Sequence, residues 1–265
     1  MQKVAVITGG SSGIGKALVL KYAQEGYAVV YTGRDTTRMD QLDQQLQDHN
    51  HLGLQLDAAS KEDNEYLINT TIERFDRIDV LVCNAGISMR ALFEDLDLEV
   101  FKDLMEVNFY GAIYATKFAL PYLFESKGNI IAVSSINGYR STPARSAYSS
   151  SKFAMQGFFE TLRTEVMTRG VHVLIVCPGF TSSNIRNAAL DANGRAQGES
   201  PRNEKKMMSP EEVAERTFRA ASQRKRDLIL TFQGKLAVFL NKVIPGKLDR
   251  MIYNAMKKEA DNPLK

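Results

Sequence analysis

The sequence predicts an α/β fold, in which helices cover both faces of one doubly wound parallel sheet of about seven strands. Over the first two thirds of the 265-residue chain, short apolar runs alternate with longer segments of helical periodicity. Strands that alternate with helices imply right-handed crossovers and parallel pairing. The apolar runs are hydrophobic at successive positions, as expected for strands that are buried on both faces.

The predicted elements follow one another in a regular order. Six apolar runs predict strands, at Val4–Thr8, Ala28–Thr32, Leu52–Leu56, Asp79–Cys83, Asn129–Ser134 and Val171–Val176. The periodic segments between them predict helices over about 14–25, 36–49, 61–75, 98–125 and 148–169. A helix near 210–222 then leads to a seventh strand, Leu228–Thr231. The polar segment 182–209 follows the sixth strand, where α/β sheets place substrate loops, and we interpret it as a mobile lid.

The length suits one sizeable domain, which we assign to residues 1–232. Residues 233–265 are expected to form a helical extension packed on this domain or at an interface. Within it, Lys235–Ile244 is apolar around most of its circumference, so this helix should be buried or lie at an interface. Contact with a membrane surface is the less favoured alternative.

The composition is that of an ordinary soluble protein, with 44% hydrophobic and 25% charged residues. The first apolar stretch is too short for a signal peptide, and no run approaches the ~18 apolar residues of a membrane span, so we expect a cytoplasmic protein. Cys83 and Cys177 each end a predicted strand, which indicates buried, reduced thiols. The scattered histidines, His49, His51 and His172, form no ligand set, so no metal is expected.

Charge is distributed unevenly along the chain. Residues 201–265 contain 15 Lys and Arg against 8 Asp and Glu, whereas the remainder contains 19 against 23. A basic C-terminal quarter could meet nucleic acid or an anionic membrane. No nucleic-acid motif accompanies the charge, so we favour solvated helix faces and expect no nucleic-acid partner.

A glycine-rich turn, Thr8-Gly9-Gly-Ser-Ser-Gly13-Ile-Gly15, directly follows the first predicted strand. Glycines allow a tight turn and let backbone N–H groups approach a pyrophosphate, whose charge the N-terminus of the next helix favours. The turn therefore predicts a Rossmann-type dinucleotide site at this end of the sheet. The residues assigned to it are Gly9, Ser11, Ser12, Gly13, Ile14 and Gly15.

The end of the second strand bears on which dinucleotide binds. Folds that choose NAD place an acid there to accept hydrogen bonds from the ribose hydroxyls. This chain has Gly33 at that position and then Arg34, whose guanidinium can grip the 2′-phosphate of NADP. Asp35 comes next, and we interpret it as the N-cap of the following helix. The sequence therefore favours NADP(H) over NAD(H).

Tyr148 and Lys152 are four residues apart, which places them on one face of a helix, one turn apart. An ammonium beside a phenol favours the phenolate and lowers the pKa of the phenol toward neutrality. Such a tyrosine can donate and accept protons near working pH. A surface tyrosine beside a solvated lysine would show the same spacing, so the pair gains weight only from the other motifs.

Those motifs occur in a fixed order along about residues 3–232. They are Thr8–Gly15, Asp57, Cys83-Asn84-Ala85-Gly86, Asn108, Ser134-Ser135, Tyr148-x-x-x-Lys152 and Pro178-Gly179. Each is weak alone, but together they closely resemble the short-chain dehydrogenase/reductase family, in its single-domain branch. Two positions depart from the common pattern: Cys83 where many relatives have asparagine, and Ser183 where the family often has threonine.

The resemblance implies a role for each matched residue. Tyr148 would protonate the carbonyl oxygen in reduction, and Ser135 would hydrogen-bond the same oxygen. Lys152 would hold the nicotinamide ribose and lower the pKa of Tyr148, while Asn108 would anchor a water that links Lys152 to solvent. Asp57 and Asn84 would line the adenosine region, and Pro178, Gly179, Thr181 and Ser183 would pack around the nicotinamide.

The resemblance implies an NADP-dependent oxidoreductase that interconverts a ketone or aldehyde and an alcohol, in a homodimer or homotetramer. Two alternatives stay open: a reductase of 3-oxoacyl thioesters, and a cofactor sensor or scaffold that binds NADP without turnover. The substrate is expected to be small and largely apolar, from Met89, Leu92, Phe93, Ile136 and Tyr139. Four arginines, at 90, 140, 145 and 186, would meet an acidic group or face water.

Overall fold

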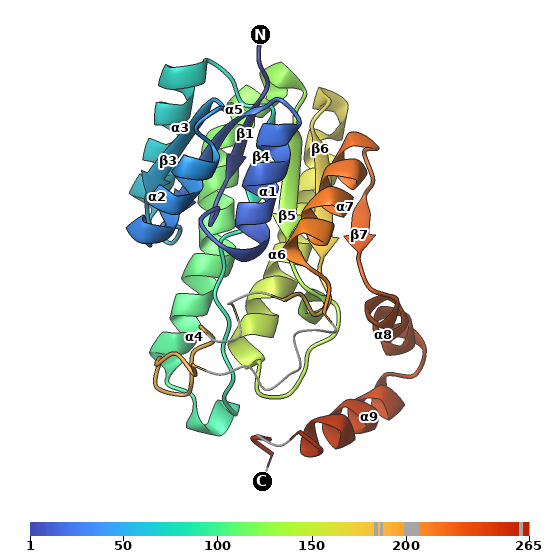
Figure 1. Cartoon of the computed structure of the whole chain (residues 1–265). Coiled ribbons are helices and arrows are strands. Elements are labelled where there is room, and N and C mark those ends of the chain that lie inside the picture. The colour runs from blue at the N-terminus through green and yellow to red at the C-terminus, as the bar shows by residue number, and fades with distance from the viewer. Residues whose placement is uncertain (183–184, 186–187, 199–206, 260–261, 265) are drawn as a thin grey trace.

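In a computed structural model of the chain, the seven strands of the described residues form one parallel sheet in the order β3-β2-β1-β4-β5-β6-β7 (Figure 1). The strands are β1 (Val4–Ile7), β2 (Ala28–Gly33), β3 (His51–Gln55), β4 (Val80–Cys83), β5 (Asn129–Val133), β6 (His172–Cys177) and β7 (Asp227–Ile229). The structure describes the chain except residues 183–184, 186–187, 199–206, 260–261 and 265. The predicted doubly wound parallel sheet is therefore confirmed.

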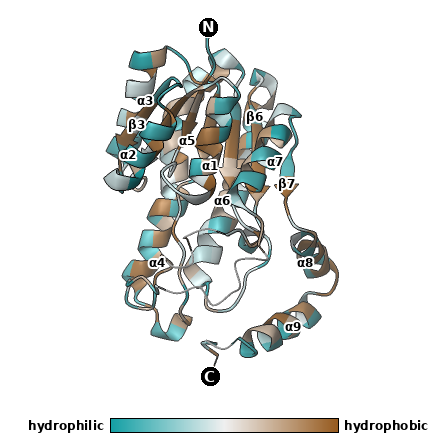
Figure 2. Ribbon diagram, in the orientation of Figure 1, coloured by the Kyte–Doolittle hydropathy of each residue, from teal (hydrophilic) through white to brown (hydrophobic). Residues whose placement is uncertain are grey.

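Helices cover both faces of this sheet, as the sequence predicts. One face is covered by α1 (Gly13–Gln24), α2 (Thr36–Gln45) and α7 (Pro210–Ser222), and the other by α3 (Lys61–Phe75), α5 (Gly111–Ser126) and α6 (Ser146–Val166). Two apolar clusters fill the layers, one against each face of the strands. Figure 2 shows the strands as the most uniformly hydrophobic part of the molecule. Their continuous apolar runs follow from this burial on both faces.

The helix expected over 98–125 is divided in the structure. It consists of α4 (Leu98–Met105), a π-helical turn over Glu106–Tyr110, and α5. A π turn inserts one extra residue into the helical ladder, and such turns are frequent at functional sites. Here the turn carries the buried Asn108.

The C-terminal extension forms two helices, α8 (Phe232–Val243) and α9 (Pro245–Lys257), beside the main body of the molecule. Of the α8 residues only Gly234 is buried, and Phe232 and Phe239 are 79% and 61% exposed. Within the single chain this apolar helix is therefore largely exposed, and its predicted place at an interface stays a prediction. No described helix is both long enough and apolar enough to cross a membrane.

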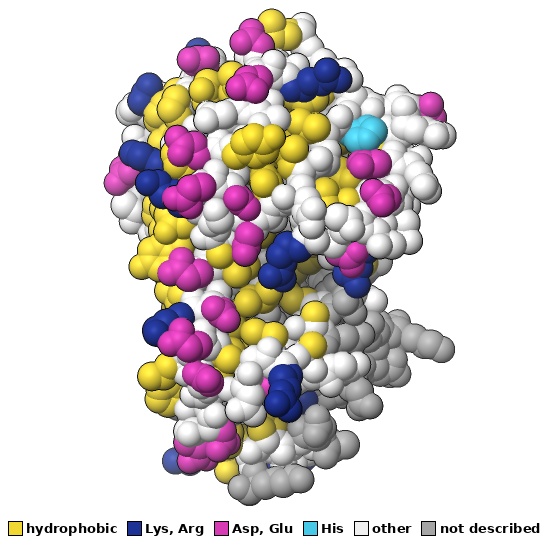
Figure 3. All heavy atoms as spheres, turned by 90° about the vertical axis from the view of Figure 1, so that its left-hand side faces the viewer, with side chains coloured by type: hydrophobic (Ala, Val, Ile, Leu, Met, Phe, Trp, Pro, Cys, Tyr) yellow, Lys and Arg dark blue, Asp and Glu magenta, His cyan; other side chains and the backbone are white. Residues whose placement is uncertain are grey.

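The surface that faces the viewer in Figure 3 belongs to the acidic first part of the chain. Acidic side chains are spread down this face among hydrophobic and basic ones. The pattern agrees with an ordinary solvated surface on the side of the molecule away from α8 and α9.

A partly buried ion pair, in which only Asp79 is buried, fixes the start of the central strands. The Asp79 carboxylate accepts hydrogen bonds from Arg77, through Nη2 at 2.6 Å and Nε at 2.9 Å, and from the backbone N–H of Val4 at 2.8 Å. Breaking a buried pair leaves the partner groups without compensation, which is costly. Asp79 therefore joins the entry of β1 to that of β4.

We predict that Asp79→Ala lowers the free energy of unfolding by about 2–4 kcal/mol, measured by urea denaturation. Glu99→Ala is the matched control, because Glu99 pairs with Lys102 on the open surface. Its effect should stay within about 0.5 kcal/mol. Equal losses in the two variants would contradict the structural role of Asp79.

Candidate active site

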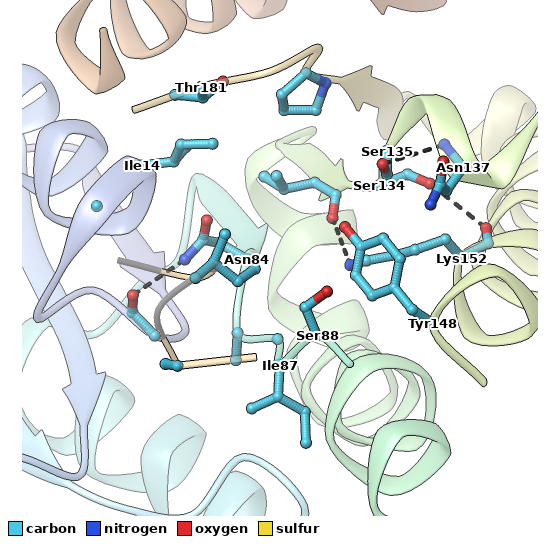
Figure 4. Close-up of a pocket in the computed structure, with 18 of the residues that line it drawn as sticks. Ile14, Asn84, Ile87, Ser88, Ser134, Ser135, Asn137, Tyr148, Lys152 and Thr181 are labelled. Atoms are coloured by element: carbon cyan, nitrogen blue, oxygen red, sulfur yellow. Dashed lines mark hydrogen bonds between the residues drawn. The ribbon is translucent and has the colours of Figure 1, made fainter. Parts of the chain in front are cut away.

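A cavity of about 700 Å³ runs along the carboxyl ends of the central strands. The turns after β1, β2, β4, β5 and β6 contribute to its walls, together with the start of α6 and parts of α8 and α9. In a parallel sheet these ends meet at one edge, and ligands bind where the strand order reverses. That reversal lies between β1 and β4 in this sheet. Figure 4 shows side chains from these turns pointing toward a common space.

The turn after β1 has a backbone that requires glycine. Gly9 and Gly13 have φ angles of +64° and +52°, in the left-handed region. A Cβ on Gly15 would lie 2.1 Å from the carbonyl oxygen of Gly9. The residues assigned to the turn all line the cavity: Gly9, Ser11, Ser12, Gly13, Ile14 and Gly15. Because side chains are absent where the backbone is closest, the start of α1 forms a cradle that fits a diphosphate.

Asn84 and Thr8 join this turn to the end of β4. The Asn84 amide donates to the carbonyl oxygens of Thr8 and Gly9, at 3.0 Å each. In return, the Thr8 hydroxyl accepts from the N–H groups of Asn84 and Ala85, at 3.0 and 3.1 Å. Asn84 lines the cavity, as predicted, and it also braces the glycine turn.

The end of β2 places Arg34, Asp35 and Arg38 on the cavity wall, with Asp57 from the end of the next strand. Asp35 caps α2 by accepting from the N–H of Arg38 at 3.1 Å, so the predicted N-cap is confirmed. The Arg38 guanidinium also pairs with Asp35 at 3.1 Å. Sequence reasoning missed Arg38, although its place in the first turn after this cap brings it to the same wall. Two guanidiniums therefore line this wall, and that of Arg38 is paired with Asp35.

Tyr148 and Lys152 lie on the first turns of α6, and Ser135, which follows β5, lies on the same side of the cavity (Figure 4). Burial raises the pKa of the Tyr148 phenol, while hydrogen bonding with Ser135 and the positive charge of Arg145 lower it. The net direction is upward. The sequence predicts a Tyr148 pKa near neutrality, and the side chains of the protein alone do not produce it. The Tyr148 phenol is therefore protonated at neutral pH.

The Lys152 ammonium is held by groups other than the phenol in this structure. Its ammonium donates to the carbonyl oxygen of Val133 at 3.0 Å and lies 3.4 Å from the sulfur of Met155. It is 6.0 Å from the centre of the Tyr148 ring. Burial lowers the pKa of Lys152 to about 8. Lys152 can therefore change its own charge close to physiological pH.

Asn108 lies in the π turn, fully buried, below the cavity. Its carbonyl oxygen accepts from the N–H of Ile87 at 2.7 Å, and its amide nitrogen donates to Ile87 O at 3.0 Å and Ser151 Oγ at 2.9 Å. A Cβ on Gly86 would lie 3.0 Å from Asn108 and 3.6 Å from the Lys152 ammonium. Gly86 thus keeps the space between these two side chains open.

The turn after β6 brings Pro178, Gly179 and Thr181 to the cavity, as predicted. A Cβ on Gly179 would lie 2.5 Å from Thr231, so glycine allows the chain entering α8 to approach. Ser183 lies outside the described residues. Residues 188–198 of the expected lid are anchored beside the cavity, because Leu190 exchanges backbone hydrogen bonds of 2.8 Å with Ser88 and Arg90. Mobility of the segment 182–209 remains a prediction.

Comparison with known proteins decides the family. The family model described as short chain dehydrogenase matches residues 3–194. Dehydrogenase/reductase SDR family member 7B of Mus musculus is 34% identical over 264 residues, covering 97% of this chain and 82% of the relative. The chain belongs to the short-chain dehydrogenase/reductase family.

Two solved structures show the same fold. An alcohol dehydrogenase from the archaeon Thermococcus sibiricus, complexed with 5-hydroxy-NADP, is 27% identical, with a TM-score of 0.76 over 87% of this chain and 96% of that one. A short-chain dehydrogenase/reductase from Burkholderia phymatum in complex with NAD is 23% identical, with a TM-score of 0.81 over 91% and 93%. The two hold different dinucleotides, so likeness alone does not choose the cofactor.

The substrate end of this short-chain dehydrogenase/reductase differs from the sequence prediction. Of the five apolar residues expected there, Ile136 lines the cavity, whereas Met89 is buried beneath it and Leu92, Phe93 and Tyr139 lie elsewhere. Arg90, Arg140 and Arg145 do line the cavity, and Arg186 lies outside the described residues. The sequence did not indicate that residues of the C-terminal extension line the cavity. They are Gln233, Gly234, Ala237, Ile252, Ala255, Met256 and Glu259. Their distance in sequence from every family motif left no signal to find them.

The two cysteines, which could in principle be reactive, are buried in the core. Burial raises the pKa of both thiols, Cys83 and Cys177, to about 12, so both are buried, free and unreactive. In the described part of the chain, no group of three or more His, Cys, Asp or Glu side chains is placed to hold a metal ion.

We predict that the buried Lys152 makes stability depend on pH. Its pKa falls from 10.5 in the unfolded chain to about 8 in the folded one, so between these values the unfolded state binds more protons and stability rises with pH. Between pH 7 and 10, the free energy of unfolding of the cofactor-free wild type should rise by on the order of 1–3 kcal/mol relative to that of Lys152→Met. Urea unfolding across this range measures the difference.

The control for this measurement is Lys61→Met, which removes an exposed lysine. Its stability should follow that of the wild type over the whole pH range. Parallel curves for Lys152→Met and the wild type would show that Lys152 keeps an ordinary pKa in the folded protein.

Proposed function

We propose that this protein is an NADP-dependent oxidoreductase that interconverts a ketone or aldehyde and an alcohol, with Tyr148 as the acid and base. The observation that carries the proposal is that two hydroxyls, those of Ser135 and Tyr148, lie on the wall of the same cavity as the glycine cradle. Family membership supports the reaction type.

The two hydroxyls suit the charge that develops in carbonyl reduction. Addition of hydride to a carbonyl builds negative charge on its oxygen, and preorganised donors in a cavity stabilise it. Ser135 and Tyr148 would donate to that oxygen, and Tyr148, protonated at neutral pH, would deliver its proton. In the direction of alcohol oxidation the same groups would act in reverse.

The residues around the cavity fit a bound dinucleotide. The cradle of Gly9, Gly13 and Gly15 would take the diphosphate, and Asp57 and Asn84 would border the adenosine part. When bound, the dinucleotide supplies or accepts the hydride. On the protein's side, Lys152 would contact the ribose next to the nicotinamide, and Asn108 would fix the backbone of Ile87 below it.

Cofactor choice is proposed on charge. Arg34 and Arg38 both line the adenosine end, while Asp35 is engaged as the cap of α2. A Cβ on Gly33 would lie 2.6 Å from Ser11 Oγ, so this position has no room for the acid that NAD-selective folds place there. An arginine pair favours the 2′-phosphate, which distinguishes NADP from NAD.

We further propose that the protein assembles as a homodimer or homotetramer through α5 and α6. Tyr110, beside α5, and Phe153 on α6 are large apolar side chains that remain 40% and 45% exposed in the single chain. Apolar groups exposed on neighbouring helices are typical of an interface between subunits.

We predict that Tyr148→Phe lowers kcat for NADPH-dependent reduction of a ketone and aldehyde panel by about 100-fold or more, because the proton donor is lost. NADPH binding, measured by fluorescence titration, should persist. Tyr139→Phe is the control, since Tyr139 packs against the core and does not line the cavity. Full turnover in Tyr148→Phe would refute the mechanism.

The same assays test the two alternative functions. NADPH binding by the wild type with no turnover of any carbonyl would favour a cofactor sensor. A strong preference for a 3-oxoacyl thioester over simple ketones would favour a 3-oxoacyl thioester reductase.

We predict that Arg34→Ala raises the Kd for NADPH by about 10- to 100-fold and leaves the Kd for NADH nearly constant, because a charge-assisted contact to the 2′-phosphate is lost. Calorimetry with both cofactors measures this. Arg74→Ala makes the same change of net charge at an exposed position away from the cavity. An equal loss for both cofactors in Arg34→Ala would contradict NADP selectivity.

A further inference from the structure

An ion pair lies inside the substrate end of the cavity. The Arg90 Nη2 donates to Glu259 Oε2 at 3.0 Å, and both residues line the cavity together with Tyr148 and Ser135. The pair joins segments 169 residues apart in sequence. Glu259 comes from the end of the C-terminal extension, beyond the residues 3–194 that match the family. Arg90 therefore lies within the residues that the family model matches, whereas its partner Glu259 lies outside them.

Arg90 is the fixed member of the pair. Its backbone N–H donates to Leu190 O at 2.8 Å, and its carbonyl oxygen accepts from the Gln197 amide at 2.8 Å. Its side chain is only 6% exposed. A guanidinium held so deeply needs an anionic oxygen beside it, because an uncompensated buried charge is costly.

Glu259 is the replaceable member. It follows the last residue of α9, Lys257, and its side chain is 20% exposed. Its carboxylate is therefore nearer to water than the Arg90 guanidinium, and its backbone lies beyond the end of α9. This difference between the two residues suits an arrangement in which the Glu259 carboxylate occupies the place that an anionic group of the substrate would take beside Arg90.

We propose that the substrate of this enzyme is a carbonyl compound with an anionic oxygen group, a carboxylate or a phosphate, that displaces Glu259 from Arg90. This inference rests on the proposed carbonyl reductase function and names the substrate class of the same site. A planar guanidinium is suited to either group, since it can donate two parallel hydrogen bonds.

The rest of the substrate end agrees with such a molecule. Ile136, Ile252 and Met256 offer apolar contacts for its body. Arg145 also lines this end, hydrogen-bonded to Ser88, and adds positive charge near Tyr148. Figure 4 shows Ser88 beside the Tyr148 ring, so the cationic wall begins next to the reacting hydroxyl. An anionic substrate would thus be drawn in and oriented with its carbonyl toward Tyr148.

The test uses methyl ketones that end in a carboxylate, in the methyl ester of that carboxylate, or in a phosphate monoester, with spacers of increasing length. For at least one spacer, the wild type should reduce an anionic ketone with a kcat/KM about tenfold above that of the ester. The carboxylate and phosphate arms show which source the site prefers. Equal or better kcat/KM for the ester at every length overturns the inference.

Two variants distinguish whether Glu259 competes with the substrate for Arg90 or whether the Arg90–Glu259 pair only holds α9 in place. Glu259→Gln removes the internal competitor and should lower KM for the anionic ketone about threefold or more relative to KM for the ester. Arg90→Met combined with Glu259→Leu removes both charges, which leaves neither partner buried alone, and should bring the anion-to-ester ratio to about one. Ile252→Ala, the control, alters the same wall without touching a charge and should change KM for both ketones together. An equal change for both in Glu259→Gln would overturn the inference.

A binding measurement separates this inference from the proposed function. Calorimetry with NADP-loaded protein compares the straight-chain carboxylic acid of the preferred spacer, without its ketone, with the corresponding methyl ester. The acid should bind the wild type more tightly and lose this advantage in the double variant. If no ketone is reduced, the carbonyl reductase proposal fails, and this comparison still decides whether Arg90 selects anions. Equal binding of acid and ester would overturn the inference.

Discussion

The site depends on the junction between β1 and β4, where the strand order reverses. The Thr8 hydroxyl and the Asn84 side chain exchange hydrogen bonds with each other's backbone at this point, so the turns after both strands are held in one arrangement. Glycines allow the two turns to touch, since a Cβ on Gly9 would lie 2.8 Å from Ala85. With this junction fixed, parallel pairing brings the ends of β5 and β6 to the same edge.

Burial governs the chemistry of the polar groups at that edge. Desolvation moves the pKa of the Tyr148 phenol upward and that of the Lys152 ammonium downward, because burial disfavours the charged form of each group. Ser135 and Arg145 oppose the effect on the phenol. A neutral phenol beside a second hydroxyl donor is the arrangement that carbonyl reduction requires, because a proton must be present before it can be given.

Both the residues that the family model matches and the C-terminal extension contribute to the cavity. Residues 3–194 match the short-chain dehydrogenase/reductase family and supply the glycine cradle and the hydroxyl pair. The C-terminal helices add the wall at the substrate end, and α9 is fastened there by the pairs Arg140–Asp249 and Arg90–Glu259. In the proposed function, the matched residues would carry the chemistry, and side chains of the C-terminal extension would contribute to selectivity.

The sequence by itself determined the sheet, its helices and the residues of the cradle, because periodicity and glycine turns are local signals. It also indicated Tyr148, Lys152 and Asn108 through spacing and resemblance. Only the tertiary structure decided that burial raises the pKa of Tyr148 and that Glu259 reaches Arg90. Desolvation and contacts between distant segments depend on the packed chain, so no local pattern contains them. The exposure of α8 could not be predicted for a similar reason, since the apolar pattern of a helix does not specify which surface covers its apolar side.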